Sequence, residues 1–166
     1  MLVQAVTSYE ISLFLHITAA VVGFGTTFAE SITFPVAMQL DRRHLPYVHR
    51  LQRRINTWFA LPALVVILAT GFYQVADGDW SLGDAWLSIS LFLVLVIAVL
   101  NLAYFIPEDR KLEEKVAAEL ASAPADGEPE LSDDYMKAAQ REGMFGAATG
   151  LMLVVIIFMM VVKPGV

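Results

Sequence analysis

Hydrophobic residues along this chain gather in four long runs that contain no Asp, Glu, Lys or Arg. The runs cover residues 11–29, 55–76, 85–107 and 143–162. About 20 apolar residues in an α-helix cross the roughly 30 Å hydrocarbon core of a bilayer. The pattern therefore predicts an all-α, polytopic membrane protein, a four-transmembrane-helix bundle in a single membrane domain, residues 1–166.

The surrounding polar residues place the four helices at about 9–40, 51–76, 84–107 and 134–163. The first helix is long, and we expect Pro35 to kink it because proline has no amide hydrogen to donate. Pro107 is expected to break the third helix for the same reason. Beyond it, the pattern predicts a short cytoplasmic amphipathic helix and then a flexible acidic linker at about 121–133.

Basic residues predict how the chain is oriented. Ten of the eleven Lys and Arg residues lie in the first and third connections, namely Arg42, Arg43, Arg50, Arg53 and Arg54, and Arg110, Lys111, Lys115, Lys137 and Arg141. Because short basic connections stay in the cytoplasm, we expect a multi-pass protein of the inner (plasma) membrane with both termini outside. We expect the basic first connection to contact anionic lipids as well as orient the chain, so nothing calls for a nucleic-acid partner.

Polar residues inside the first apolar run are the main candidates for function. His16, Gly23 and Glu30 follow helical spacing and share one face. His16 is open to three interpretations: an interhelical hydrogen bond, a haem or metal ligand, or a proton relay. Glu30 is expected to form an ion pair with Arg53 or Arg54, although a proton-carrying or ion-binding role is the alternative.

Glycines form a second pattern, in the fourth run. Gly146 and Gly150 have the GxxxG spacing, and Gly143 precedes them by about one turn. Small residues let membrane helices approach closely, so these positions are expected to pack helices together. With Gly23, they would alternatively make room for a flat cofactor.

The stretch LFLHITAAVVGFG, the basic connection after it and the pattern RRINTWFALPALVVILATG carry a resemblance to a known group. Over residues 11–76 the chain resembles small bacterial membrane proteins of the CopD-like and HemJ-like group, most closely their uncharacterised members. The resemblance implies a bundle of four or slightly more helices. It also implies that His16 is the group's helix-one histidine, which the haem-pathway oxidases link to haem binding.

Three hypotheses for function remain. The first is haem b binding or membrane redox chemistry, with His16 as the iron ligand and Gly23 beside the ring. The second is a non-catalytic bundle that assembles with itself or with a membrane complex through its glycine faces. The third is transport of a small ion or proton. Without Cys, the chain has no thiolate metal site. The sequence contains no recognisable motif of a soluble enzyme, so whether the protein is an enzyme stays open.

Single-cysteine labelling tests the predicted orientation, because the natural chain has no Cys. We expect Ser81→Cys to react with an impermeant maleimide in intact cells, and Ser122→Cys to react only after permeabilisation. Labelling of both variants on the same side of the membrane would contradict the four-span topology.

Overall fold

The computed structural model describes residues 6–78, 80–124 and 127–165, which form helices and no strands. The elements in chain order are α1 (Ser8–Glu30), α2 (Thr33–Leu40), the short 3-10 helix η1 (Arg42–His44), α3 (Leu45–Ile55), the π-helical turn η2 (Asn56–Ala60), α4 (Leu61–Asp77), α5 (Ala85–Leu100), the π-helical turn η3 (Asn101–Phe105), α6 (Ile106–Ser122) and α7 (Asp133–Val162).

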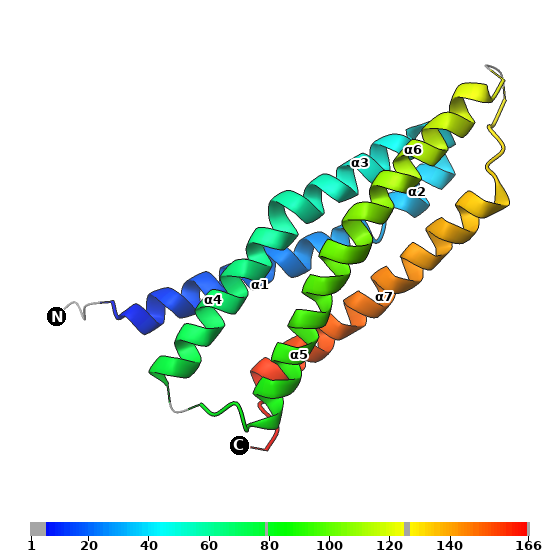
Figure 1. The fold of residues 1–166 in the computed structure, drawn as a ribbon. Helices are drawn as coiled ribbons and strands as arrows, with labels where there is room; N and C mark the ends of the chain where they lie inside the picture. The colour runs from blue at the N-terminus through cyan, green and yellow to red at the C-terminus, as the bar shows by residue number, and fades with distance from the viewer. Residues whose placement is uncertain (1–5, 79, 125–126, 166) are drawn as a thin grey trace.

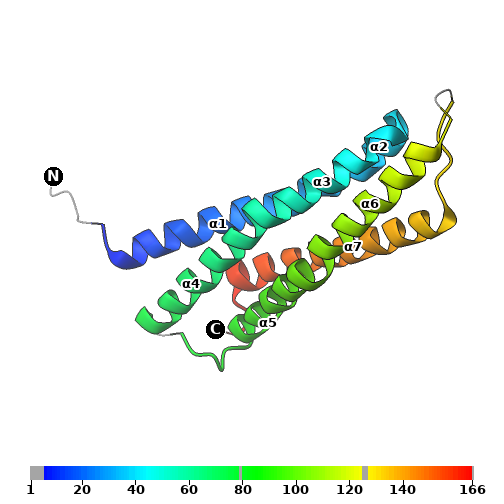
Figure 2. The same ribbon diagram turned by 45° about the horizontal axis from the view of Figure 1, so that its top comes forward.

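These elements join into four rods, each long and apolar enough to cross a membrane. The rods are Ser8–Leu40, Arg42–Asp77, Ala85–Ser122 and Asp133–Val162. They run along one another in an elongated bundle (Figures 1 and 2), where α1 packs against α4, α5 against α7 and α3 against α6. The all-α, four-span architecture expected from the sequence is confirmed.

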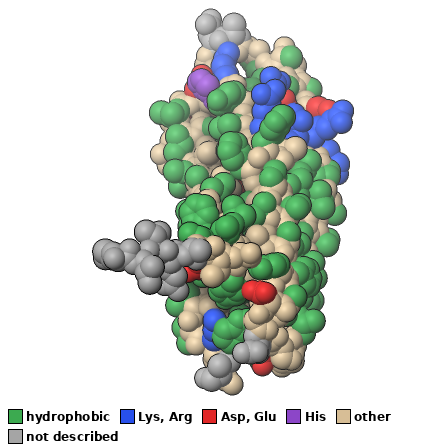
Figure 3. All heavy atoms as spheres, turned by 90° about the vertical axis from the view of Figure 1, so that its left-hand side faces the viewer, with side chains coloured by type: hydrophobic (Ala, Val, Ile, Leu, Met, Phe, Trp, Pro, Cys, Tyr) green, Lys and Arg blue, Asp and Glu red, His purple; other side chains and the backbone are tan. Residues whose placement is uncertain are grey.

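The outside of the bundle is largely apolar. Large hydrophobic side chains such as Phe14, Val65, Phe92 and Val161 are exposed on all four rods. Figure 3 shows one such face, with hydrophobic side chains over most of its length and Lys and Arg gathered near one end. So much exposed apolar surface is explained when lipid is the solvent.

The bundle has two hydrophobic cores. One lies among the transmembrane segments and includes Leu64, Ile67, Val94 and Leu153. The other packs α2, α3, α6 and the start of α7 around Leu45, Leu112, Val116 and Tyr135. We call this second region the basic end, because α3 and α6 carry most of the Lys and Arg residues.

Two prolines are accommodated inside continuous helices. Pro62 follows η2 and Pro107 follows η3, and each π turn begins with an asparagine six residues before the proline. In a π turn the backbone hydrogen bonds join residues five apart instead of four. The regular α-helical hydrogen bonds are therefore already interrupted where proline has no amide hydrogen to donate. The helix expected to end near Pro107 therefore continues to Ser122, which makes the amphipathic segment an extension of the third rod.

The two π turns contact each other. Asn101 Nδ2 donates a hydrogen bond to Asn56 Oδ1 over 2.7 Å, and both side chains are buried. Such bonds between membrane helices typically contribute about 0.6–2 kcal/mol. The second and third rods are thus joined where both helices depart from α geometry.

The first rod is interrupted at Ser31 and Ile32, between α1 and α2. Pro35 lies one turn later and would crowd the carbonyl group of Ser31 in an unbroken helix. The expected linker lies between α6 and α7, where the described residues 123–124 and 127–132 form no helix.

Two neighbouring glycines on α1 provide a matched test of helix packing. A Cβ atom at Gly23 would lie 2.9 Å from Ala63 Cβ, whereas one at Gly25 would meet nothing within 4 Å. We expect Gly23→Ala to lower the free energy of unfolding by about 1–3 kcal/mol, and Gly25→Ala to leave it unchanged or raise it. Unfolding in mixed micelles measures both. Equal effects, or no rescue of Gly23→Ala by Ala63→Gly, would contradict this contact.

Candidate functional site

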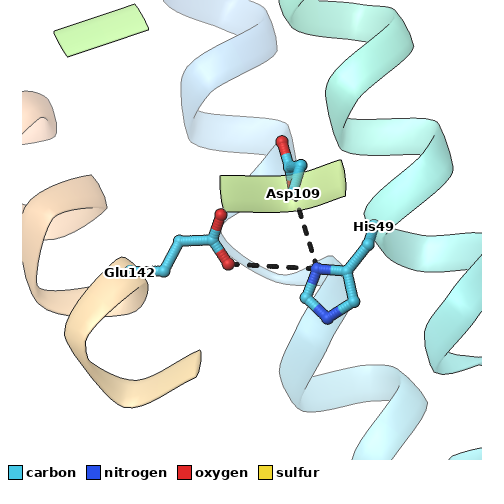
Figure 4. A group of neighbouring side chains, drawn as sticks. All are labelled: His49, Asp109 and Glu142. Atoms are coloured by element: carbon cyan, nitrogen blue, oxygen red, sulfur yellow. Dashed lines mark ion pairs between the residues drawn. The ribbon is translucent and has the colours of Figure 1, made fainter. Parts of the chain in front are cut away.

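Three ionisable side chains from three helices meet inside the basic end. They are His49 of α3, Asp109 of α6 and Glu142 of α7 (Figure 4). His49 Nδ1 lies 3.5 Å from Asp109 Oδ1 and 3.9 Å from Glu142 Oε2. One donor atom from each residue fits within 4.8 Å of the others, a separation at which one metal ion could contact all three.

The cluster is removed from solvent. The exposed fraction of His49 is 0% and that of Asp109 is 1%. Within the described residues, His49 Nδ1 and Asp109 Oδ1 are buried and have no hydrogen-bond partner. A buried polar atom without a partner costs free energy, so these two atoms need an explanation.

Neighbouring acids on α6 have cationic partners. Glu108 pairs with Arg141 and with Lys111, at 3.0 and 3.3 Å. Glu113 accepts hydrogen bonds from Arg50 and Arg53, at 2.7 and 2.8 Å.

Asp109 differs from these two neighbours. Among the described residues, its recorded ionic contact is His49. The least exposed of the three acids thus has no recorded ion pair with Lys or Arg within the described part of the chain, although the charge of Arg53 lies near enough to act on it.

Tyr135 holds the imidazole from the other side. Its hydroxyl group and His49 Nε2 share a hydrogen bond of 2.8 Å, and the two rings meet edge to face. Tyr135 is fully buried. This contact fixes the ring plane and leaves Nδ1 directed at the two carboxyl groups, the arrangement by which outer partners orient a metal-binding histidine.

The cluster borders a cavity of about 450 Å³ between the helix pairs α1–α4 and α5–α7. Asp109, Glu142 and Glu30 line it at the basic end, and the walls continue to Leu64 and Leu153 of the central core. A buried polar site thus opens into a space that extends toward the middle of the membrane.

The residues expected from the sequence lie in two separate places. His16 is near the other end of α1, where its Nδ1 atom makes a 2.9 Å hydrogen bond with Thr70 Oγ1 of α4. Glu30 lines the cavity and accepts a 3.5 Å hydrogen bond from Asn56. Arg53 pairs with Glu113, and Arg54 is exposed. An ion pair of Glu30 with Arg53 or Arg54 therefore stays a prediction.

The candidate glycines also differ in their surroundings. Gly23 lines the cavity and also lets α1 approach Ala63. Gly143 and Gly146 line the cavity too, and a Cβ atom at either would meet nothing within 4 Å. At Gly150 an added Cβ would lie 3.7 Å from Phe28. In this single chain, Gly143 and Gly146 widen the cavity, while helix packing through them stays a prediction.

Sequence reasoning missed His49, Asp109 and Glu142 because all three lie outside the four uncharged apolar runs. It assigned His49 to the basic first connection, Asp109 to the amphipathic helix and Glu142 to the charged start of the fourth helix. Each of them lies on the apolar stripe of its helix, at the spacings Leu45–Val48–His49, Asp109–Leu112–Val116 and Tyr135–Ala139–Glu142. A titratable residue on an apolar stripe is the signal that could have found them.

The chain matches one family of known proteins. A family model described as "Predicted integral membrane protein (DUF2269)" matches residues 10–164. The chain belongs to this family. No curated protein and no solved structure matches it.

The family match agrees with a multi-pass membrane protein that contacts the bilayer. It supports the expected likeness to uncharacterised membrane proteins. The grouping with CopD-like and HemJ-like proteins stays a hypothesis.

Two tyrosines allow a matched test of the cluster's support. Tyr135→Phe would leave buried His49 Nε2 without its partner, so we expect the free energy of unfolding to fall by about 1–3 kcal/mol. Tyr47, which is exposed on the same basic end, should tolerate Phe with a change below about 0.5 kcal/mol. Thermal unfolding in detergent compares them, and equal stabilities would contradict the role given to Tyr135.

Proposed function

We propose that this membrane protein binds a divalent transition-metal ion with His49, Asp109 and Glu142, and that it handles this ion at the cytoplasmic side of the bilayer. The observation that carries the proposal is the unpartnered pair of buried atoms, His49 Nδ1 and Asp109 Oδ1, beside a second carboxyl group. A cation between the three residues would supply each atom with a partner.

The donor chemistry supports a transition metal. One imidazole nitrogen and two carboxylate oxygens suit Zn²⁺, Mn²⁺ or Fe²⁺, all of which accept mixed nitrogen and oxygen ligands. Two ligands about 2.1 Å from the same ion at a tetrahedral angle lie roughly 3.4 Å apart. The separations of 3.5 and 3.9 Å from His49 Nδ1 are close to this value.

The charge around the cluster supports the same conclusion. Glu108 and Glu113 have arginine partners, whereas Asp109 and Glu142 face each other and His49. Two carboxylates buried together repel one another unless a proton or a cation lies between them. The cavity beside them would leave room for water or another ligand on the ion.

The distribution of basic residues supports a cytoplasmic location for the cluster. The cluster lies at the basic end, which the distribution of Lys and Arg assigns to the cytoplasm of an inner membrane. This orientation, with both termini outside, is part of the proposal. Transport of the bound ion is a natural extension, since the cavity leads from the cluster toward the central core.

Haem b binding or redox chemistry through His16 is a second candidate. Its support is that Thr70 holds Nδ1 and so orients Nε2 for a ligand. The space beside His16 is about 40 Å³, however, while pockets for small ligands usually have 300–1,000 Å³. Haem there would require the helices around His16 to separate.

Metal binding to chelator-treated protein tests the main proposal, with His44 as the matched control. We expect the wild-type protein to retain zinc after desalting and to unfold at higher temperature with zinc; a ligand at 100 times its Kd stabilises a protein by about 2.7 kcal/mol. His49→Ala should lose both effects, whereas His44→Ala, in the exposed part of the same connection, should keep them. Equal zinc retention in all three proteins would contradict the proposal.

Asp109→Asn separates a metal site from a purely structural network. Without metal, this change removes a buried carboxylate that has no recorded ion pair with Lys or Arg among the described residues, so the variant should be at least as stable as the wild type. It should also lose stabilisation by zinc. A large loss of stability in chelator would mean that Asp109 supports the fold instead.

Absorbance spectra of wild-type and His16→Ala protein, expressed with haem supplied, would test haem binding through His16.

A further inference from the structure

The cavity contains a carboxyl group outside the metal cluster. Glu30 Oε1 is buried and without a hydrogen-bond partner, and Glu30 Oε2 has only the long contact with Asn56 among the bonds recorded for the described residues. Glu30 comes from α1, a helix that contributes nothing to the cluster of His49, Asp109 and Glu142. A metal ion at the cluster would therefore leave the unpartnered oxygen of Glu30 unexplained.

All the ionisable side chains in the described lining of the cavity are acidic. Its described lining includes three carboxyl groups, those of Glu30, Asp109 and Glu142, and no Lys or Arg. Asp109 is almost fully buried, and its Oδ1 atom is unpartnered. Such a wall disfavours an anion and favours a cation.

The rest of the wall is largely apolar and partly aromatic, with uncharged polar side chains such as Asn56 and Gln140 among its residues. Phe34, whose ring lies beside that of His49, and Phe105, one turn before Asp109, line the end that contains the carboxyl groups. Phe24 lines the cavity where it packs against the central core, together with aliphatic residues such as Leu64. The face of an aromatic ring attracts a cation, most strongly where water is excluded. An inorganic ion would gain nothing from the aliphatic part of this wall, whereas an apolar body would fill it.

We propose that the cavity binds an organic cation with an apolar body, with Glu30 as its counter-charge, Phe34 and Phe105 beside its positive centre and Phe24 against its apolar body. The volume of about 450 Å³ lies in the range of small-molecule sites. Gly143 and Gly146 contribute to this size, because neither position has a Cβ atom to fill the space. This site does not depend on a metal at His49.

Binding of tetraphenylphosphonium to the purified, chelator-treated full chain in detergent tests this proposal. We expect saturable binding that exceeds the signal from protein-free micelles, and little binding of the neutral analogue triphenylphosphine oxide. Glu30→Gln should weaken binding of the cation about tenfold and leave the neutral compound unaffected. Glu114→Gln, which neutralises an exposed acid outside the cavity, should bind like the wild type.

Two phenylalanines of α1 complete the test. Phe24→Ala should weaken binding of the cation severalfold, whereas Phe14→Ala, on the exposed side of the same helix, should not. Equal binding of the cationic and neutral probes would overturn the proposal, and so would wild-type affinity in Glu30→Gln protein of normal melting temperature. Zinc binding is measured separately, so failure of the metal site and failure of this site give different results.

Discussion

Burial of carboxyl groups without matching cations is the constraint on which this structure depends. Glu108 and Glu113 sit in arginine pairs, but Asp109 and Glu142 are brought together by α6 and α7 with His49 of α3 between them. Removing a charge from water is costly, and a second like charge nearby increases the cost. Within the described residues, a proton shared by the two carboxyl groups or a cation bound between them would balance the arrangement, and the metal ion that we propose is such a cation.

The two hydrophobic cores explain how the helices hold such a cluster in place. Lipid provides no hydrophobic drive between transmembrane helices, so close approach, as at Gly23 and Ala63, must hold α1 to α4. At the basic end the helices extend into the polar region and pack a conventional core around Leu45, Leu112 and Tyr135. That second core fixes the ring of His49 while the looser packing between the helix pairs leaves a cavity.

The sequence predicted the four spans because their apolar runs are long and free of charge, and burial in lipid leaves few alternatives to a helix. It placed Glu30 on one helix face with Gly23, and in the structure both residues line the cavity. It did not predict the continuous third rod, because the proline rule gives a break at Pro107 unless a π turn precedes it. Nor did it predict the cluster, because contacts between residues 49, 109 and 142 depend on packing of segments far apart in the chain.

X-ray absorption at the zinc edge of zinc-loaded protein tests the central claim most directly. We expect nitrogen and oxygen neighbours at about 2.0–2.1 Å, with the outer-shell scattering of one imidazole. His49→Ala, which should not retain zinc after desalting, should lose this imidazole signal even when its spectrum is recorded with excess zinc. A spectrum with oxygen neighbours alone and no imidazole signal, unchanged in His49→Ala, would show that zinc is bound elsewhere and would contradict the account.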